Sequence, residues 1–309
     1  MTTTAPPSAP QTIRSVLLGI LGVPPSVAAQ SAAVSPDDAL AQPDTAKVYE
    51  FTSVDYPGAA QTLVFDTDGT TALGAFIFDP SSASSPVTAF TEAGGAYQIL
   101  NVPNSTASIA TGINTSGLIV GVYSDVAGSA HGFATSDSST FTDVDFPGST
   151  DTQAIDVNDA GVIVGDYFDA ANVEHGFVNT GGTFTAIDFP GAKSTAVGGI
   201  NANGDVVGGY TDTTGTNHGF LFSGGVFTPI NFPLASSTTA WGINDNGDIA
   251  GLYTDTAGTS HGFVYADNNF STVDVAGASA TQLIRIKNWE QVTGVYIDAL
   301  TAEHGLTGQ

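Results

Sequence analysis

Residues 184–226 read FTAIDFPGAKSTAVGGINANGDVVGGYTDTTGTNHGFLFSGGV, and residues 227–269 repeat the pattern as FTPINFPLASSTTAWGINDNGDIAGLYTDTAGTSHGFVYADNN. The histidines mark the same pattern along the chain with a step of 43 or 44 residues. Each is followed by glycine and then by phenylalanine or leucine, in the series His131, His175, His218, His261 and His304. A fixed period of this length indicates a repeat architecture.

The chain divides into six such units, which begin near Phe51, Tyr97, Phe141, Phe184, Phe227 and Phe270. The first and last units depart most from the pattern. Thr88 stands where the first unit should have its histidine, and the last unit carries Arg285, Lys287 and Trp289 around its Asn-x-x-Gly position. Atypical terminal units are expected where a repeat array is capped or closed.

Each unit contains four short runs of β-branched and aromatic residues, bounded by turn residues. In the fourth unit these runs are Phe184–Phe189, Thr195–Ile200, Asp205–Tyr210 and His218–Phe222. Asn201–Gly204 and Asp212–Gly215 carry the type I turn signature, and Ser223–Gly225 can close a third hairpin. Three hairpins join four strands into one antiparallel sheet.

Four strands and three hairpins in about 43 residues describe a propeller blade. A β-solenoid is the rival architecture, but its parallel strands do not need hairpins. Glycines within Val207–Tyr210 indicate close approach of neighbouring sheets. We predict an all-β chain in which residues 47–309 form a six-bladed β-propeller. The leftover run Phe51–Tyr56 should close it by pairing in the blade that holds His304.

Residues 1–46 carry no repeat and are rich in Ala, Pro, Ser and Thr, so we expect a flexible leader or linker. The apolar run Val16–Val23 follows Arg14, as in a secretory signal peptide, and is too short to span a bilayer. A leader processed by another route and a short docking helix are alternative interpretations.

The charges are few and lopsided: 30 Asp and Glu stand against 5 Lys and Arg, a formal net charge of −25. A nucleic-acid partner needs Lys and Arg to neutralise its phosphates, and anionic lipid needs them too, so both are excluded as partners. The chain has no cysteine and hence no disulfide and no thiol nucleophile. Cationic partners and divalent metals remain compatible with this charge.

The motifs Phe-Thr-x-Ile-Asp-Phe-Pro-Gly, Gly-Ile-Asn-x-x-Gly and His-Gly-Phe together resemble the bacterial HAF repeat family, described as probable extracellular repeats. The resemblance covers residues 97–309 well and residues 51–96 weakly. This chain has His-Gly-Phe where the family name indicates His-Ala-Phe, a small-for-small change. The resemblance implies secretion or surface display, and it implies no activity.

Side chains that recur in every unit favour structural roles, because catalysis needs one constellation and not five. We therefore expect the histidines to be buried and to hydrogen-bond turn groups within each blade. A rim of carboxylates could hold calcium, which prefers oxygen ligands. This candidate metal series is Asp125, Asp169, Asp212, Asp255 and Asp298. The alternative is that each of these aspartates caps its own turn.

A second carboxylate series precedes the Pro-Gly turns and comprises Asp55, Asp145, Asp188 and Asp274, with Asn231 in the remaining place. Carboxylate pairs at the right separation serve glycoside hydrolysis. Repetition again favours a structural role. The sequence also lacks a nucleophile elbow, a phosphate-cradling loop and a His-Glu-x-x-His motif.

The residues that break the repeat are the best candidates for binding: Trp241, Trp289, Arg285 and Lys287. A tryptophan beside a cation can stack on a sugar or contact a protein partner. The same residues can instead plug the closure between the first and last blades.

We predict an exported, non-enzymatic binding or surface-structural propeller of the bacterial cell surface, with an unidentified surface glycan or protein as partner. It would need no cofactor, apart from calcium if the acidic rim binds it. One alternative is an extracellular polysaccharide-active hydrolase or lyase, which should gather unrepeated polar residues at one mouth of the channel. Another is a self-assembling fibre or surface-layer subunit, with residues 1–46 reaching into a neighbour.

Overall fold

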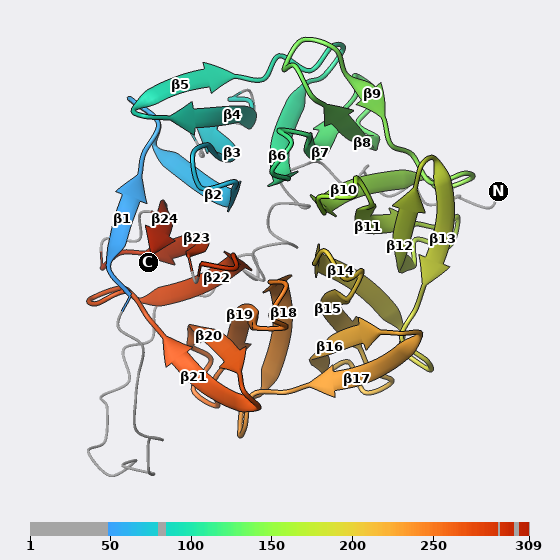
Figure 1. Cartoon of the computed structure of the whole chain (residues 1–309), viewed down its shortest axis with the longest axis vertical. Helices are drawn as coiled ribbons and strands as arrows, with labels where there is room; N and C mark the ends of the chain where they lie inside the picture. The colour runs from blue at the N-terminus through green and yellow to red at the C-terminus, as the bar shows by residue number, and fades with distance from the viewer. Residues whose placement is uncertain (1–48, 80–84, 290, 300–302, 309) are drawn as a thin grey trace, which may run out of the picture.

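The computed structural model describes residues 49–79, 85–289, 291–299 and 303–308, and our expectations for residues 1–46 lie outside them. All regular structure in these ranges is β-strand, and no helix in them is long and apolar enough to cross a membrane. Figure 1 shows six four-stranded antiparallel sheets arranged as a ring. The predicted six-bladed β-propeller is confirmed.

Blade 1 consists of β2 (Gln61–Thr67), β3 (Ala72–Ile77), β4 (Thr88–Ala93) and β5 (Ala96–Ile99). Blade 2 consists of β6 (Ala107–Ile113), β7 (Ile119–Ser124), β8 (Ala130–Thr135) and β9 (Thr142–Asp143). Blade 3 consists of β10 (Asp151–Val157), β11 (Ile163–Phe168), β12 (Glu174–Thr180) and β13 (Thr183–Ile187). Each blade is one up-and-down meander, as the spacing of turn signatures predicts.

Blade 4 consists of β14 (Ser194–Ile200), β15 (Val206–Thr211), β16 (Asn217–Ser223) and β17 (Val226–Ile230). Blade 5 consists of β18 (Ser237–Ile243), β19 (Ile249–Thr254), β20 (Ser260–Ala266) and β21 (Asn269–Val273). Blade 6 consists of β22 (Ala280–Ile286), β23 (Val292–Ile297), β24 (Glu303–Gly308) and β1 (Phe51–Val54). The four runs expected in the fourth unit are all strands, with ends displaced by at most two residues.

The ring closes through β1, the first strand of the chain, which is the outer strand of blade 6. It pairs antiparallel with β24, from Phe51 opposite Gly308 to Val54 opposite Gly305. In Figure 1 the blue strand β1 lies beside the dark red strand β24. The predicted closure is confirmed, and a solenoid is excluded because the strands of every blade pair antiparallel.

A β-bulge interrupts the pairing between the first and second strands of every blade. In blade 4 the bulge brings the carbonyl oxygen of Ala196 so close that a Cβ at Gly208 would lie 2.1 Å from it. A side chain at residue 208 is therefore excluded by atoms of its own sheet. We had expected the glycine to be needed for the close approach of the neighbouring sheet. The expectation holds for Gly209, whose added Cβ would meet Thr239 of blade 5 at 3.2 Å.

Closing the ring satisfies the backbone groups of β24, which would otherwise be an exposed sheet edge. We expect deletion of residues 1–56 to lower the melting temperature by roughly 10 °C and to promote association, because β24 loses its partner. Deletion of residues 1–46 is the matched control and should leave the melting temperature within about 2 °C. Differential scanning calorimetry checks both, and equal melting temperatures for the two deletions would contradict this role of β1.

Candidate functional site

One position of each inner strand, next to the bulge, faces the central channel. Written in register, this position reads Asp66, Gly112, Asp156, Gly199, Gly242 and Arg285. The glycines make room for the charged side chains. A Cβ at Gly112 would lie 2.9 Å from Oδ1 of Asp156, and one at Gly242 would lie 2.7 Å from Cα of Arg285. Three glycines and three charged residues thus fill the channel together.

Arg285 is the centre of this plug and is only 3% exposed. Its Nη2 donates to the carbonyls of Ile155 at 2.8 Å and Thr111 at 3.2 Å. Its Nη1 donates to the carbonyls of Trp241 and Ile284, both at 3.1 Å. The guanidinium therefore ties the inner strands of blades 2, 3, 5 and 6 at the axis. We expected Arg285 either to bind a ligand or to plug the closure between the first and last blades; its four side-chain hydrogen bonds run to blades 2, 3, 5 and 6, and none of these four reaches blade 1.

Two buried carboxylates balance the two cations of the last unit. Oδ2 of Asp156 lies 3.6 Å from Nε of Arg285 and accepts a hydrogen bond from the N–H of Ile200 at 3.0 Å. Asp66 is fully buried, and its Oδ1 lies 2.6 Å from Nζ of Lys287. Burial raises the pKa of Asp156, although Arg285 opposes that shift.

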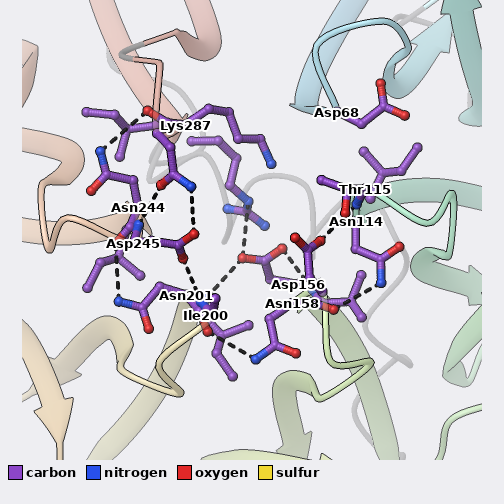
Figure 2. Close-up of a pocket in the computed structure, with 18 of the residues that line it drawn as sticks. Asp68, Asn114, Thr115, Asp156, Asn158, Ile200, Asn201, Asn244, Asp245 and Lys287 are labelled. Carbon is purple, nitrogen blue, oxygen red and sulfur yellow. Dashed lines mark hydrogen bonds and ion pairs between the residues drawn. The ribbon is translucent and has the colours of Figure 1, made fainter.

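An asparagine ring frames the mouth of the channel above this plug (Figure 2). Asn114 donates through Nδ2 to the carbonyl of Asn158 at 3.0 Å, and Asn158 donates likewise to Asn201 at 3.0 Å. The ring continues from Asn201 to Asn244 at 3.1 Å and from Asn244 to the carbonyl of Lys287 at 3.4 Å. These asparagines are turn residues that also join neighbouring blades, as their repetition indicates.

The mouth contains a hollow of about 90 Å³ whose lining changes in character at blades 6 and 1. In blade 6, Lys287 stands at the position of the repeated asparagine, and Trp289 stands at the tip of the same turn, where the regular units have a small residue. Asp68 of blade 1 lines the same hollow. Trp289 is 43% exposed, and Nε1 of its indole donates to Oε1 of Gln291 at 3.0 Å. Its ring lies on Gly69, where an added Cβ would be 3.0 Å from Cζ2 of the indole.

The structure separates the four predicted binding residues into two groups. Trp241 is 7% exposed and Arg285 is in the plug, so neither offers its side chain to a ligand at the mouth. Lys287 and Trp289 both line the mouth hollow. Asp66 and Asp156 belong to the same constellation and were missed, although writing the six units in register places them at the same position of the repeat as Arg285.

Unrepeated polar side chains thus gather at one mouth, which is the feature we expected of an enzyme. The carboxylates there are engaged in the fold. Oδ1 of Asp159 accepts from the N–H of Thr115 at 2.9 Å, and Oδ2 of Asp245 accepts from Nδ2 of Asn288 at 2.6 Å. Oδ1 of Asp68 accepts from the N–H groups of Thr70 and Thr71, which hold its turn. This arrangement suits hydrogen bonding to a ligand better than proton transfer.

The repeated histidines lie on the opposite rim, where the second and third strands of each blade are joined. Each imidazole is clamped between two polar side chains and stacks on a tyrosine. Nδ1 of His261 lies 2.7 Å from Oδ2 of Asp274, Nε2 lies 3.6 Å from Oδ2 of Asp255, and the ring centroid is 5.0 Å from that of Tyr253. The structural role is as expected. The expected burial of the histidines is wrong, because their five side chains are 24–29% exposed.

The five rim aspartates proposed for calcium are the partners of the histidine Nε2 atoms. They also cap their own turns, as where Oδ1 of Asp255 accepts from the N–H groups of Ala257 and Thr259, each at 2.8 Å. Within the part of the chain that the structure describes, no group of three or more His, Asp or Glu side chains converges as metal ligands would. Calcium at this rim stays a prediction.

Blade 3 holds a carboxyl pair that the other blades lack. Asp166 is buried in β11, and its Oδ1 accepts from the N–H of Val197 in blade 4 at 2.6 Å. Burial raises its pKa well above the ordinary value, and the charge of Glu174 adds to that shift. Burial likewise raises the pKa of Glu174 to about 7. Blade 4 has Gly209 and Asn217 at these two positions.

No family model and no curated protein matches the chain. Among solved structures, TolB from Acinetobacter baumannii is 8% identical with a TM-score of 0.57, over 79% of this chain and 65% of that one. The β-propeller domain of the Trilobed protease from Pyrococcus furiosus is 10% identical with a TM-score of 0.53, over 81% and 94%. A mutant of the Aleuria aurantia lectin in complex with Fucalpha1-6GlcNAc is 10% identical with a TM-score of 0.50, over 80% and 91%. At these identities the likenesses show the propeller fold alone.

The plug predicts a large effect of removing Arg285. Arg285→Met leaves Asp156 buried without its cation and four carbonyls without their donor, so we expect a loss of about 3–5 kcal/mol in the free energy of unfolding. Lys193→Met makes the same charge change at an exposed side chain and should cost less than about 0.5 kcal/mol. Urea titration of both variants checks this, and equal stability would show that Arg285 is dispensable.

The raised pKa values of His131 and Glu174 predict that the free energy of unfolding falls as the pH rises above 5. Partial burial lowers the pKa of His131, but the hydrogen bond and charge of Asp145 outweigh it, so the net shift is upward. The folded state therefore holds protons on His131 and Glu174 that the unfolded chain releases earlier, and stability declines as the pH passes each folded pKa. We expect a melting temperature roughly 5 °C higher at pH 5.5 than at pH 8.

The repeat offers a matched variant for this pH dependence. Glu174→Asn installs the residue type that blade 4 has at Asn217 and should remove part of the decline, whereas Glu92→Gln, in the outer half of blade 1, should not. Calorimetry between pH 4.5 and 8.5 measures the decline. A flat or rising profile in the unaltered protein would refute the assignment.

Proposed function

We propose that this chain is a carbohydrate-binding propeller that acts outside the cell and takes its ligand at the channel mouth beside Trp289. One observation carries the proposal. The only tryptophan with an exposed ring, at 43%, lies where the repeat is broken, on the rim of a hollow lined by amide, carboxylate and ammonium groups. Aromatic rings stack on the apolar faces of sugars, and such polar groups fix their hydroxyls.

The hydrogen bonds at the mouth favour a rigid, prepared site. The turn that carries Trp289 is joined to the neighbouring blade, because the N–H of Asp245 donates to Oδ1 of Asn288 at 2.7 Å. The indole is held from below by Gly69 and from the side by Gln291. A ligand that stacks on this ring would lose little free energy to ordering the protein.

Two further points support the wider proposal. The lectin from Aleuria aurantia, a protein of this fold, is known in complex with Fucalpha1-6GlcNAc, so the fold is compatible with sugar binding. The resemblance of the repeats to the HAF family supports action outside the cell. A surface-structural role and self-assembly stay predictions.

The second candidate is an enzyme acting on an extracellular polysaccharide, which the gathering of unrepeated polar residues at the mouth favours. Asp68, Asp159 and Asp245 are the carboxylates of the hollow that are not buried, and Asp68 and Asp159 are the two that we select for substitution. Release of reducing ends from a polysaccharide that the chain binds, lost in Asp68→Asn and Asp159→Asn, would establish this candidate. Binding without release favours the proposal above.

Trp289 gives the proposal a direct test. We expect Trp289→Ala to weaken binding of the best saccharide by at least about tenfold, because the stacking surface is lost. Asn246→Ala changes the equivalent turn-tip residue of blade 5 and should leave affinity unchanged. Isothermal titration with a panel of mono- and trisaccharides measures both. Absence of binding by the unaltered chain to every member, or equal affinity of the two variants, would overturn the proposal.

A further inference from the structure

The seams between neighbouring blades follow one packing rule near the mouth. Two positions on the back of one blade face two positions on the front of the next, and all four are apolar in four of the five seams other than the closing one. Between blades 3 and 4 the four are Val164, Val178, Ile200 and Val206, and between blades 5 and 6 they are Ala250, Val264, Ile286 and Val292. Between blades 2 and 3 they are Val120, Ala134, Val157 and Ile163, and between blades 4 and 5 they are Val207, Leu221, Ile243 and Ile249. The seam between blades 1 and 2 has Leu73, Thr91, Ile113 and Ile119.

The seam that closes the ring, between blades 6 and 1, breaks this rule. Its four positions are Thr293, Thr307, Thr67 and Ala72. Relative to the seam between blades 3 and 4, three branched apolar side chains are replaced by threonine and one by alanine, which removes carbon atoms and introduces hydroxyls. A groove of about 310 Å³ is present here, within the range of ~300–1,000 Å³ typical of small-molecule pockets. We name this hollow the closing groove.

The back wall of the closing groove carries Thr52 and Thr307, two members of a ladder of three threonines. Thr52 in β1 lies opposite Thr307 in β24, and Thr307 lies opposite Thr293 in β23, so the three share one face of the sheet. Thr293 is fully buried, and its hydroxyl is already bonded to the carbonyl of Phe65 at 2.9 Å. Thr52 and Thr307 are accessible from the groove. This wall suits a partner that can both donate and accept hydrogen bonds.

The opposite wall and the rim add further polar groups from blade 1 and the turn of blade 6. Glu92 and Tyr97 line the groove from the outer half of blade 1, and Gln291 lines it from the turn before β23. Gln291 is also the acceptor of the Trp289 indole N–H, and Gly69 lines the groove while supporting the indole ring. The indole therefore stands between the mouth hollow and the closing groove.

We infer that the closing groove is a saccharide subsite and that the ligand is an uncharged oligosaccharide, with one sugar stacked on Trp289 and the next units bound along the threonine ladder. The inference rests on the proposed function. Hydroxyl side chains match the hydroxyls of sugars, which both donate and accept. An anionic sugar is disfavoured, because Glu92 lines the groove and the chain carries a net charge of −25.

The repeat itself supplies the variant that closes the groove. Ala72→Ile with Thr307→Val restores the residue types found at the same positions of the regular seams, at Ile119 and Val264. We expect the double variant to keep or raise the melting temperature, because it fills the seam as the other blades do. Thr91→Val makes the same kind of change in the seam between blades 1 and 2 and is the matched control.

Isothermal titration with cellotriose, maltotriose, chitotriose and xylotriose, and with glucose, N-acetylglucosamine and xylose, tests the inference. We expect the double variant to bind the preferred trisaccharide at least about tenfold more weakly, close to the affinity of its monosaccharide, which should itself be unchanged. Thr91→Val should bind both as the unaltered chain does.

The other outcomes separate this inference from the proposed function. If the double variant, folded by calorimetry, binds the trisaccharide as tightly as the unaltered chain, the closing groove is not a subsite and the site at Trp289 stands. If Trp289→Ala keeps trisaccharide affinity while the double variant loses it, the groove stands and the mouth site is wrong. If the unaltered chain binds none of these sugars, both are overturned.

Discussion

The guanidinium of Arg285 hydrogen-bonds four of the six inner strands at the axis of the ring, and the other residues at the axis are those that can accommodate it. A buried cation is tolerable only when it is paired and hydrogen-bonded. Asp156 supplies the charge, and the bulges next to the axis present the carbonyls. The glycines at 112, 199 and 242 supply the space, because any side chain at those positions would overlap the plug. The channel is therefore sealed by polar groups instead of by the apolar side chains that fill the seams.

The repeated residues and the irregular ones have different roles in this chain. Repeated asparagines tie each turn to the next blade, and repeated histidines clamp the opposite rim. The irregular residues are concentrated in the first and last units, which meet when β1 pairs with β24. The same departures close the ring, seal the channel and leave an exposed indole beside a polar groove. Closure and the candidate site are thus two consequences of one set of substitutions.

The sequence was sufficient for the fold, because the period, the turn signatures and the leftover run Phe51–Tyr56 can all be recognised without knowing any contact between distant residues. The site was predicted in part. Trp289 and Lys287 were recognised as breaks in the repeat, and both line the mouth. Asp66 and Asp156 were missed because an aspartate near a turn looks like a turn residue until the strands show that it faces the axis. The threonines of the closing seam were missed for the same reason: they are unremarkable alone and informative only beside their apolar equivalents.

The exposure of the histidines could not be derived from the sequence. Their period indicated a structural role, but the depth of a side chain depends on where the strand begins relative to the rim. Each histidine lies at the second position of its strand, next to a turn, so water reaches its ring. The two partners of each histidine come from turns at the same rim, which is why the clamp is polar and not part of the apolar core.

The central claim is that binding occurs at one irregular site and not at the repeated rim. Hydrogen–deuterium exchange of the full chain, with and without the saccharide that it binds most tightly, tests this claim directly. The account predicts slower exchange in the turns around Asp68 and Trp289 and in β1, with no change at the turns that begin at Asp125, Asp169, Asp212 and Asp255. Slower exchange of similar size at those repeated turns, with none at Trp289, would contradict it.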